Sequence, residues 1–431
     1  MAAERLRCRD RASVAVLVLV LVGLVLRLAW VAWVGRDPTG LNDPVNYLLS
    51  GASIADGDGF RNFAGDLTAY YPIGYPAFVG VVTWLVVHTP LPDQVGVTVG
   101  VIQAFLGAAT VLLSAGIARR LVSPGAGVAT AAVLALWPNL IFHTGVLLGE
   151  TLFNLLFVAA VAVLVARPWP SGGPSAARMA AVGALLGAAV LVRPVVLVVV
   201  PFLVLAMVVA GVGWRPALRG TGVALGLAAV VVAPWTVRNA VVLDAFVPVS
   251  TNTGDNLCIG RFPGATGWFA FSEECGAEVA GVDDGTAQEP ARDRRNTRLA
   301  LEWAVDDPVR ELTLVGWRAY HTFRGDHDAL WAANSYDQDP QLSDRTSHLL
   351  GVVADGWYWT MLGLGAIGAR ALLDRRDGRR LFVLAAAVSS ALVPLAFFGD
   401  MRFHVPAVPL WAIAAGIALS RLPAVLLTTR R

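Results

Sequence analysis

The chain has 431 residues, of which 56% are hydrophobic and only 15% are charged, and its formal net charge at pH 7 is +2. Soluble domains carry about 25% charged residues, so this composition excludes an ordinary soluble protein. The net charge is uninformative about partners, and we expect no nucleic acid among them. Long apolar runs recur from Ser13 to Leu419 without the alternation of a membrane β-barrel, which predicts an all-α, polytopic membrane protein.

The first apolar run, Ser13–Val34, follows a basic N-terminal segment and is about 22 residues long, enough to cross a bilayer. No small-residue cleavage site is evident, so we expect an uncleaved span that starts in the cytoplasm. Arg27 interrupts this run, and we interpret it as an arginine that snorkels to the lipid headgroups. Residues 35–72 then form a first loop outside the cytoplasm.

The next apolar run, Pro72–Val87, is short: about 16 residues rise about 24 Å, against a hydrocarbon core of about 30 Å. Arg119 and Arg120 end the following run and belong in the cytoplasm by the positive-inside rule. The residues before that run must then lie outside. Pro72–Val87 is therefore predicted to be a half-length helix on the outer side, either in-plane or re-entrant.

The same rule places the later arginine clusters inside and yields about ten spans with both termini in the cytoplasm. We divide the chain into a membrane module at residues 1–235, a large loop region at residues 236–350 outside the cytoplasm, and C-terminal transmembrane helices at residues 351–431. The spans are expected at Ser13–Val34, Val95–Ile117, Gly127–Leu147, Thr151–Val165, Arg178–Val192, Val195–Ala210, Thr221–Trp235, Gly351–Ala369, Leu381–Phe398 and Val405–Leu419.

The large loop region carries structure of its own. Val309–Arg324 mixes large apolar side chains with Arg, so we expect it on the membrane surface. Cys258 and Cys275 share this oxidising-side loop, which makes them a candidate disulfide. Closing about 18 residues would stabilise the fold by about 3 kcal/mol in the loop-entropy account. The His and Asp residues near His327 lack a metal-ligand spacing, so no metal or cofactor is predicted, and a divalent cation has no support.

Asp43 is the first residue that could carry chemistry. Asp43-Pro44 reads as a helix start in which Asp43 is the cap, Pro44 takes the first position and Gly57 ends the helix. A carboxylate at the membrane surface could also act as a general base on a hydroxyl. The two roles are compatible, because a capping Asp at a loop tip is well oriented.

Four further charged residues stand on the same predicted face. Glu150 begins a span, where an acidic group complements the helix dipole or belongs to a site. Arg193, Arg238 and Arg402 stand at the outer ends of spans, where the positive-inside rule predicts few arginines. Each either snorkels to headgroups or binds phosphate, whose oxygens match a guanidinium in bidentate geometry.

Taken in order, several short elements resemble the GT-C membrane glycosyltransferases, in the branch akin to protein O-mannosyltransferases and lipid A aminoarabinose transferases. The resemblance covers roughly residues 13–420, and Ile73 departs from it because the family usually has a second Pro there. We expect no C-terminal outer domain after the last span, so the acceptor stays open. The elements are Asn42-Asp43-Pro44, Tyr71–Pro76, Gly149–Phe153, Leu191–Pro194, Pro234–Asn239 and Gly399–Phe403.

The resemblance implies a hexosyl or pentosyl transferase of the inner or plasma membrane. It would take sugar from a polyprenyl-phosphate carrier at an extracytoplasmic site and pass it to a protein, lipid or polysaccharide acceptor. Asp43 would match the catalytic base and Glu150 the second acidic position. Attack opposite the departing phosphate would invert the anomeric carbon. Tyr71, Tyr75 and Asn256 complete the candidate site as loop residues near the substrate.

Two other classes stay open. A transporter or flippase of a lipid-linked or small solute would place ionisable residues near the bilayer midplane, with broken helices and inverted repeats. Here the charges stand mostly at span ends, and the sequence has no evident repeat. An O-antigen-type polymerase or ligase would share the donor chemistry but not the early loop that carries Asp43.

Overall fold

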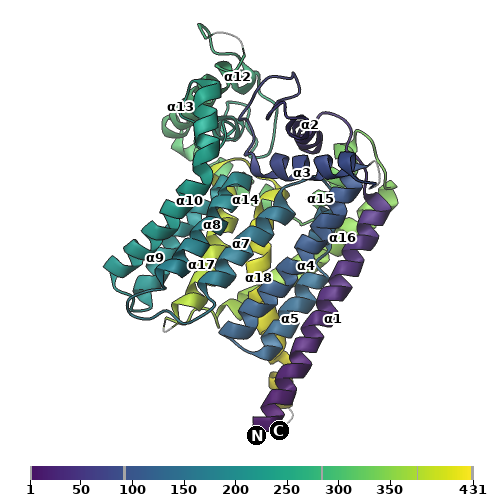
Figure 1. Cartoon of the computed structure of the whole chain (residues 1–431), viewed down its shortest axis with the longest axis vertical. Coiled ribbons are helices and arrows are strands. Elements are labelled where there is room, and N and C mark those ends of the chain that lie inside the picture. The colour runs from purple at the N-terminus through teal and green to yellow at the C-terminus, as the bar shows by residue number, and fades with distance from the viewer. Residues whose placement is uncertain (1, 91–93, 283–284, 376, 429–431) are drawn as a thin grey trace.

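The computed structural model describes residues 2–90, 94–282, 285–375 and 377–428, which form helices, turns and two isolated β-bridges but no strand. Figure 1 shows most long helices side by side in one bundle, with the start of α1 and the end of α18 at the same end. The predicted all-α fold is confirmed. The bundle contains α1 (Ala2–Val34), α4 (Val95–Leu121), α5 (Pro124–Ala135), α6 (Pro138–Phe142), α7 (Glu150–Leu164), α8 (Ala176–Val192), α9 (Val199–Val209), α10 (Trp214–Leu243), α16 (Asp344–Ala369), α17 (Gly378–Leu392) and α18 (Val408–Thr428).

Shorter elements connect these helices, and several gather at the opposite end of the bundle. In the bundle, α18 packs against α5 and α16, α4 packs against α1, α5 and α7, and α8 packs against α7 and α10. The connecting elements are α2 (Asp43–Ala55), α3 (Gly74–His88), α11 (Thr253–Ile259), α12 (Glu273–Gly276), α13 (Gln288–Asp306), α14 (Pro308–Phe323) and α15 (Asp328–Ala333), with the 3₁₀ turns η1 (His143–Gly145), η2 (Pro194–Val198), η3 (Ser335–Asp337), η4 (Val393–Ala396) and η5 (Met401–Ala407).

The described helices identify a multi-pass membrane protein. Five stretches are long and apolar enough to cross a bilayer, and a sixth counts if α5 and the helix after it form one span bent by 61°. The other predicted spans fall on shorter apolar helices and on α16. The number of spans, their sidedness and the division into three parts remain predictions. The five stretches are Arg11–Val34, Val95–Leu121, Trp214–Leu243, Gly378–Ala396 and Met401–Leu422.

The half-length helix predicted at Pro72–Val87 corresponds to α3, which packs against α2 and α4. In Figure 1, α3 lies across the loop end of the bundle, whereas α4 runs along it. This is the orientation that the in-plane alternative predicts.

Arg27 has a different role from the one predicted. The break between α5 and α6 leaves the last carbonyl groups of α5 without helical partners inside the bundle. The Arg27 guanidinium donates hydrogen bonds to the carbonyl oxygens of Leu134 (3.2 Å) and Ala135 (3.5 Å), and to Gly23 of its own helix (3.0 Å). The residue is 1% exposed, so the snorkelling interpretation is wrong. Arg27 caps a helix break on a neighbouring element.

The first loop (residues 35–72) is fastened to the large loop region (residues 236–350) at both of its ends. Near its end, the Glu289 carboxylate accepts hydrogen bonds from the Thr68 hydroxyl (2.6 Å), the Ala69 amide (2.8 Å) and the Thr251 hydroxyl (2.6 Å). Near its start, Arg36 forms an ion pair with Asp339 at 2.9 Å. Charge-assisted bonds of this kind are stronger than neutral ones, so the two loops form one frame.

Helix α14 forms at the segment predicted to lie on the membrane surface. Several of its large apolar side chains are exposed, with Val309 and Leu312 each 74% accessible, while Leu314 and Arg318 are buried. An exposed apolar stripe of this kind suits the headgroup boundary, and its contact with lipid remains a prediction.

We predict that Arg27→Leu destabilises the protein, because the carbonyl groups at the helix break lose a charged donor inside an apolar bundle. A hydrogen bond to a charged group contributes about 1.5–3 kcal/mol, which is several degrees of thermal midpoint. Thermal unfolding of the purified protein in detergent measures the effect. Arg27→Lys should fall in between, and Arg120→Leu, at an exposed position, is the matched control. A midpoint for Arg27→Leu equal to that of the control would contradict the capping role.

Candidate active site

Asp43 is the first residue of α2, but the neighbouring Asn42 caps that helix. The Asn42 side-chain oxygen accepts a hydrogen bond from the Val45 amide at 3.3 Å. The prediction that Asp43 is the cap is therefore wrong. Both Asp43 oxygens are engaged elsewhere: Oδ1 accepts from the Tyr71 hydroxyl at 2.7 Å, and Oδ2 pairs with Arg402 at 2.6 Å.

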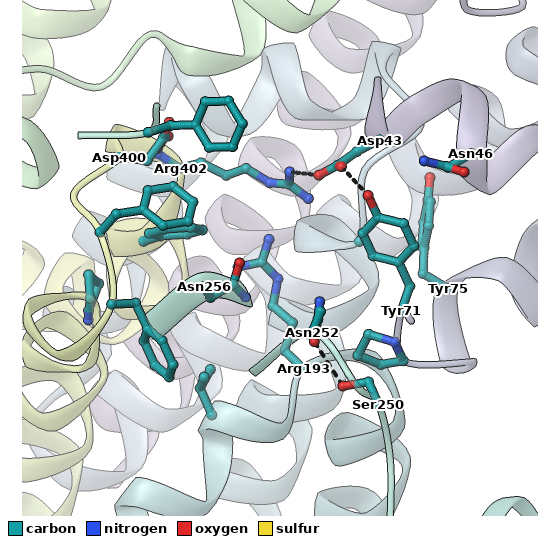
Figure 2. Close-up of a pocket in the computed structure, with 18 of the residues that line it drawn as sticks. Asp43, Asn46, Tyr71, Tyr75, Arg193, Ser250, Asn252, Asn256, Asp400 and Arg402 are labelled. Carbon is teal, nitrogen blue, oxygen red and sulfur yellow. Dashed lines mark hydrogen bonds and ion pairs between the residues drawn. The ribbon is translucent and has the colours of Figure 1, made fainter. Parts of the chain in front are cut away.

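A cavity of about 850 Å³ opens beside Asp43. Its walls come from the first loop, the large loop region, and the chain segments that follow α8 and α17. Figure 2 shows side chains from all of these segments converging on one space. The sequence-predicted residues that line it are Asp43, Tyr71, Tyr75, Arg193, Asn256 and Arg402.

Glu150 lies behind the cavity wall and not in it. Its side chain is 0% exposed, and its Oε1 atom pairs with both Arg193 and Arg402. Its Oε2 atom has no hydrogen-bond partner among the described residues. A buried carboxylate needs such pairing because desolvation otherwise disfavours its charge. The geometry favours a positioning role for Glu150, since a fully buried group cannot touch a molecule in the cavity.

Asp43, Arg402, Glu150 and Arg193 form a continuous array of charges. The Asp43 side chain is 34% exposed and the Arg193 side chain is 16% exposed, so both ends of the array reach the cavity. Arg193 pairs with Glu150 through one terminal nitrogen, and the described residues provide no partner for its other nitrogens. Since Arg402 also pairs with Asp43, the array as a whole carries no net charge, and the unpaired nitrogens of Arg193 are the part of it that can bind an anion.

Arg238 lies apart from this array. Its guanidinium donates to the carbonyl oxygens of Thr68 (2.7 Å) and Phe60 (3.3 Å), and it lies 4.7 Å from the Trp235 ring. It is not among the residues that line the cavity. The structure therefore does not bring Arg238 together with Arg193 and Arg402, and its contacts support the first loop.

Three tyrosines hold the Asp43 side of the cavity. The Tyr47 ring lies 5.2 Å from Tyr71 and 5.1 Å from Tyr75 in edge-to-face contacts, and the Tyr75 hydroxyl donates to Gln103 at 3.1 Å. Such pairs add about 0.5–1.5 kcal/mol beyond burial. Burial and the Asp43 charge hold the pKa of Tyr71 well above its usual value. Tyr71 therefore stays protonated and donates to Asp43.

Several lining residues were not predicted. Asp400 lines the cavity, and burial, aided by the nearby Asp328 carboxylate, raises its pKa to about 6. Tyr336 also lines it from a left-handed turn, with φ values of 51°, 55° and 67° at Ser335, Tyr336 and Asp337. This conformation costs about 1–2 kcal/mol per residue, and no sequence signal marks it. Asp400 lies in the element Gly399–Phe403, on which the family resemblance partly rests, and that element could have indicated it as a site residue.

The described residues contain no group of three or more His, Cys, Asp or Glu side chains arranged to hold a metal ion. Cys258 and Cys275 are joined by a disulfide bond, with their Cα atoms 5.8 Å apart.

No family model matches the sequence, and neither does any curated protein. Solved structures share its fold. ArnT from Cupriavidus metallidurans bound to undecaprenyl phosphate is 16% identical with a TM-score of 0.58, over 94% of this chain and 60% of that one. The Archaeoglobus fulgidus oligosaccharyltransferase in the apo form is 13% identical with a TM-score of 0.57, over 97% of this chain and 51% of that one.

The oligosaccharyltransferase AglB from Archaeoglobus fulgidus, in complex with an inhibitory peptide and a dolichol-phosphate, is 12% identical with a TM-score of 0.55, over 95% of this chain and 52% of that one. The chain thus spans between 51% and 60% of the length of these structures. It has the GT-C fold that the order of its motifs predicts.

The two acidic residues should differ sharply in their effect on stability. Glu150→Gln leaves two arginines without their buried counter-charge, which should cost about 3–5 kcal/mol. Asp43→Asn removes a partly exposed charge and should cost less than about 1 kcal/mol. Thermal unfolding of the two purified variants in the same detergent compares them directly. Equal losses would show that Glu150 does not hold the array together.

Proposed function

We propose that the chain is an integral-membrane glycosyltransferase that moves a sugar from a polyprenyl-phosphate donor to an acceptor hydroxyl outside the cytoplasm. The array of Asp43, Arg402, Glu150 and Arg193 is the observation that carries the proposal. It places a reachable carboxylate and an arginine with unpaired donor nitrogens in one cavity. The fold supports the donor class, because similar structures contain undecaprenyl phosphate or dolichol-phosphate.

The reaction that this array fits is a direct displacement. The acceptor hydroxyl attacks the anomeric carbon while Asp43 takes its proton. The bond between the anomeric carbon and the phosphate oxygen breaks, and the polyprenyl phosphate leaves with the bonding electron pair. Arg193 and Arg402 stabilise the charge that develops on the phosphate. Attack from the Asp43 side and departure towards Arg193 would invert the anomeric configuration.

The lipid part of the donor has a place next to the phosphate. Pro194, Val195 and Val196 follow Arg193 directly in the chain and line the cavity. Val393 and Pro394 of η4 line the same cavity, and α17, which leads into η4, packs against η2. This apolar wall suits isoprenoid units, since apolar pockets with a few polar groups are typical of lipid ligands. The phosphate would then lie at the boundary between the charged and the apolar parts.

The Asp43→Asn variant tests the base. We expect normal expression and near-complete loss of transfer, because an amide cannot accept the hydroxyl proton at neutral pH. The measurement is release of undecaprenyl phosphate from undecaprenyl-phosphate sugars in membranes that contain the native acceptor, with the new glycoside as the second product. Transfer at the wild-type rate would refute the assignment. If the wild type moved the undecaprenyl-phosphate sugar across the membrane without releasing undecaprenyl phosphate, a flippase would be favoured.

The Arg193→Ala variant tests the phosphate contact. We expect kcat/KM for the donor to fall about ten- to a hundredfold, the effect of losing one charge-assisted contact. Arg193→Lys should be intermediate, because an ammonium group cannot match two oxygens in a plane. Arg298→Ala, at a side chain that is 71% exposed, is the control. Full activity of the Lys variant with an unchanged donor KM would point to snorkelling instead.

A further inference from the structure

Helix α11 of the large loop region presents one face to the cavity and other faces to its neighbours. Asn252, Asn256 and Ile259 line the cavity, at the spacings of four and three residues that mark one side of a helix. Asp255 and Cys258 belong to another side of the same turn and are buried. The sequence therefore divides this short helix into a cavity face and an anchoring face.

The anchoring face is held by several partners. Asp255 accepts a hydrogen bond from Asn296 of α13 at 2.7 Å. The Gly254 amide donates to the Asp293 side chain at 2.6 Å. Cys258 forms the disulfide with Cys275. Two hydrogen bonds and one disulfide thus fix α11, and none of them involves the residues of its cavity face.

Two glycines allow these close contacts. A Cβ atom at Gly254 would lie 2.1 Å from the Asp293 carbonyl oxygen, and one at Gly260 would lie 2.1 Å from the Phe397 carbonyl oxygen. Real Cβ atoms do not approach backbone oxygens so closely, so both ends of α11 need glycine. The glycine-rich sequence around α11 is therefore explained by packing, and it fixes where Asn256 points.

The two amides on the cavity face have unused hydrogen-bonding capacity. The Asn256 side chain makes no hydrogen bond to the described residues, and the Asn252 side chain accepts one from Ser250 at 3.0 Å. Figure 2 shows Asn252 and Asn256 in the part of the cavity where Arg193 enters. A primary amide both donates and accepts, which matches the hydroxyl groups of a sugar.

The charge around this face limits the ligand further. Asn252, Asn256 and Ile259 are uncharged, and the rings of Trp268 and Phe269 line the same cavity. Asp400 lines it as well, and Asp328 does so while paired with His143 at 3.2 Å, so an additional carboxylate on the ligand would meet the like charge of Asp400. An uncharged sugar ring with several hydroxyl groups fits these walls, and a uronic acid does not.

We propose that Asn252 and Asn256 form the subsite that hydrogen-bonds the sugar of the donor, and that this sugar carries no carboxylate group. The inference rests on the proposed function and deepens it. Arg193 would bind the lipid phosphate, and the cavity face of α11 would bind the sugar. Separate segments of the chain would therefore recognise the phosphate and the sugar of the donor.

The experiment compares two kinds of lipid on the purified full-length protein in nanodiscs. Binding is measured for undecaprenyl phosphate alone and for undecaprenyl phosphate carrying glucose, galactose, mannose, arabinose or galacturonic acid. We expect a neutral sugar to give the tightest binding. Asn256→Ala should weaken that binding about tenfold and leave undecaprenyl phosphate within about twofold, since the lost hydrogen bonds reach only the sugar.

Two variants make the comparison selective. Arg193→Ala should weaken the binding of both kinds of lipid, because both carry the phosphate. Leu257→Ala changes a residue of α11 that does not line the cavity and is the matched control, which should bind both kinds as the wild type does. Equal losses of both lipids in Asn256→Ala, no loss of either, or tightest binding of galacturonic acid would overturn the proposal. The proposed function fails on a different result, namely absence of sugar transfer by the wild type.

Discussion

The pairing of one fully buried carboxylate with two arginines determines how the rest of the cavity is built. Glu150 has no exposure to solvent, so its charge must be compensated within the protein. Arg193 and Arg402, from distant parts of the chain, meet at its Oε1 atom. Arg402 then reaches Asp43 of the first loop at 2.6 Å. The burial of the Glu150 carboxylate, unfavourable by itself, thereby brings together segments that lie up to hundreds of residues apart in the sequence.

The charged members of this array could be predicted from the sequence, because charge in an apolar chain is costly and therefore informative. Arginines at the predicted outer ends of spans stood against the positive-inside trend, and Asp43 and Glu150 fell on the same face. Local pattern could not decide between equivalent candidates. The sequence predicts Asp43 as the helix cap, whereas Asn42 takes that position and Asp43 contacts Tyr71 and Arg402.

Other features depend on contacts that no local pattern encodes. Arg238 has the same sequence context as the other outer arginines, yet it binds carbonyl groups of the first loop. Arg27 looks like a snorkelling residue until the helix break beside it is known. The left-handed turn around Tyr336 includes two residues, Ser335 and Tyr336, that rarely adopt that conformation. In each case a distant segment overrides the local preference.

The disulfide that anchors α11 implies an order of maturation. Disulfides form and persist in oxidising compartments, and the loop region would reach one on export if it lies outside the cytoplasm, as predicted. The arginine–carboxylate array draws on the bundle and the first loop and does not depend on oxidation. A freshly inserted chain would therefore hold its charged residues in place before its sugar-facing wall is locked. For the proposed enzyme, oxidative folding would then be the last step of maturation.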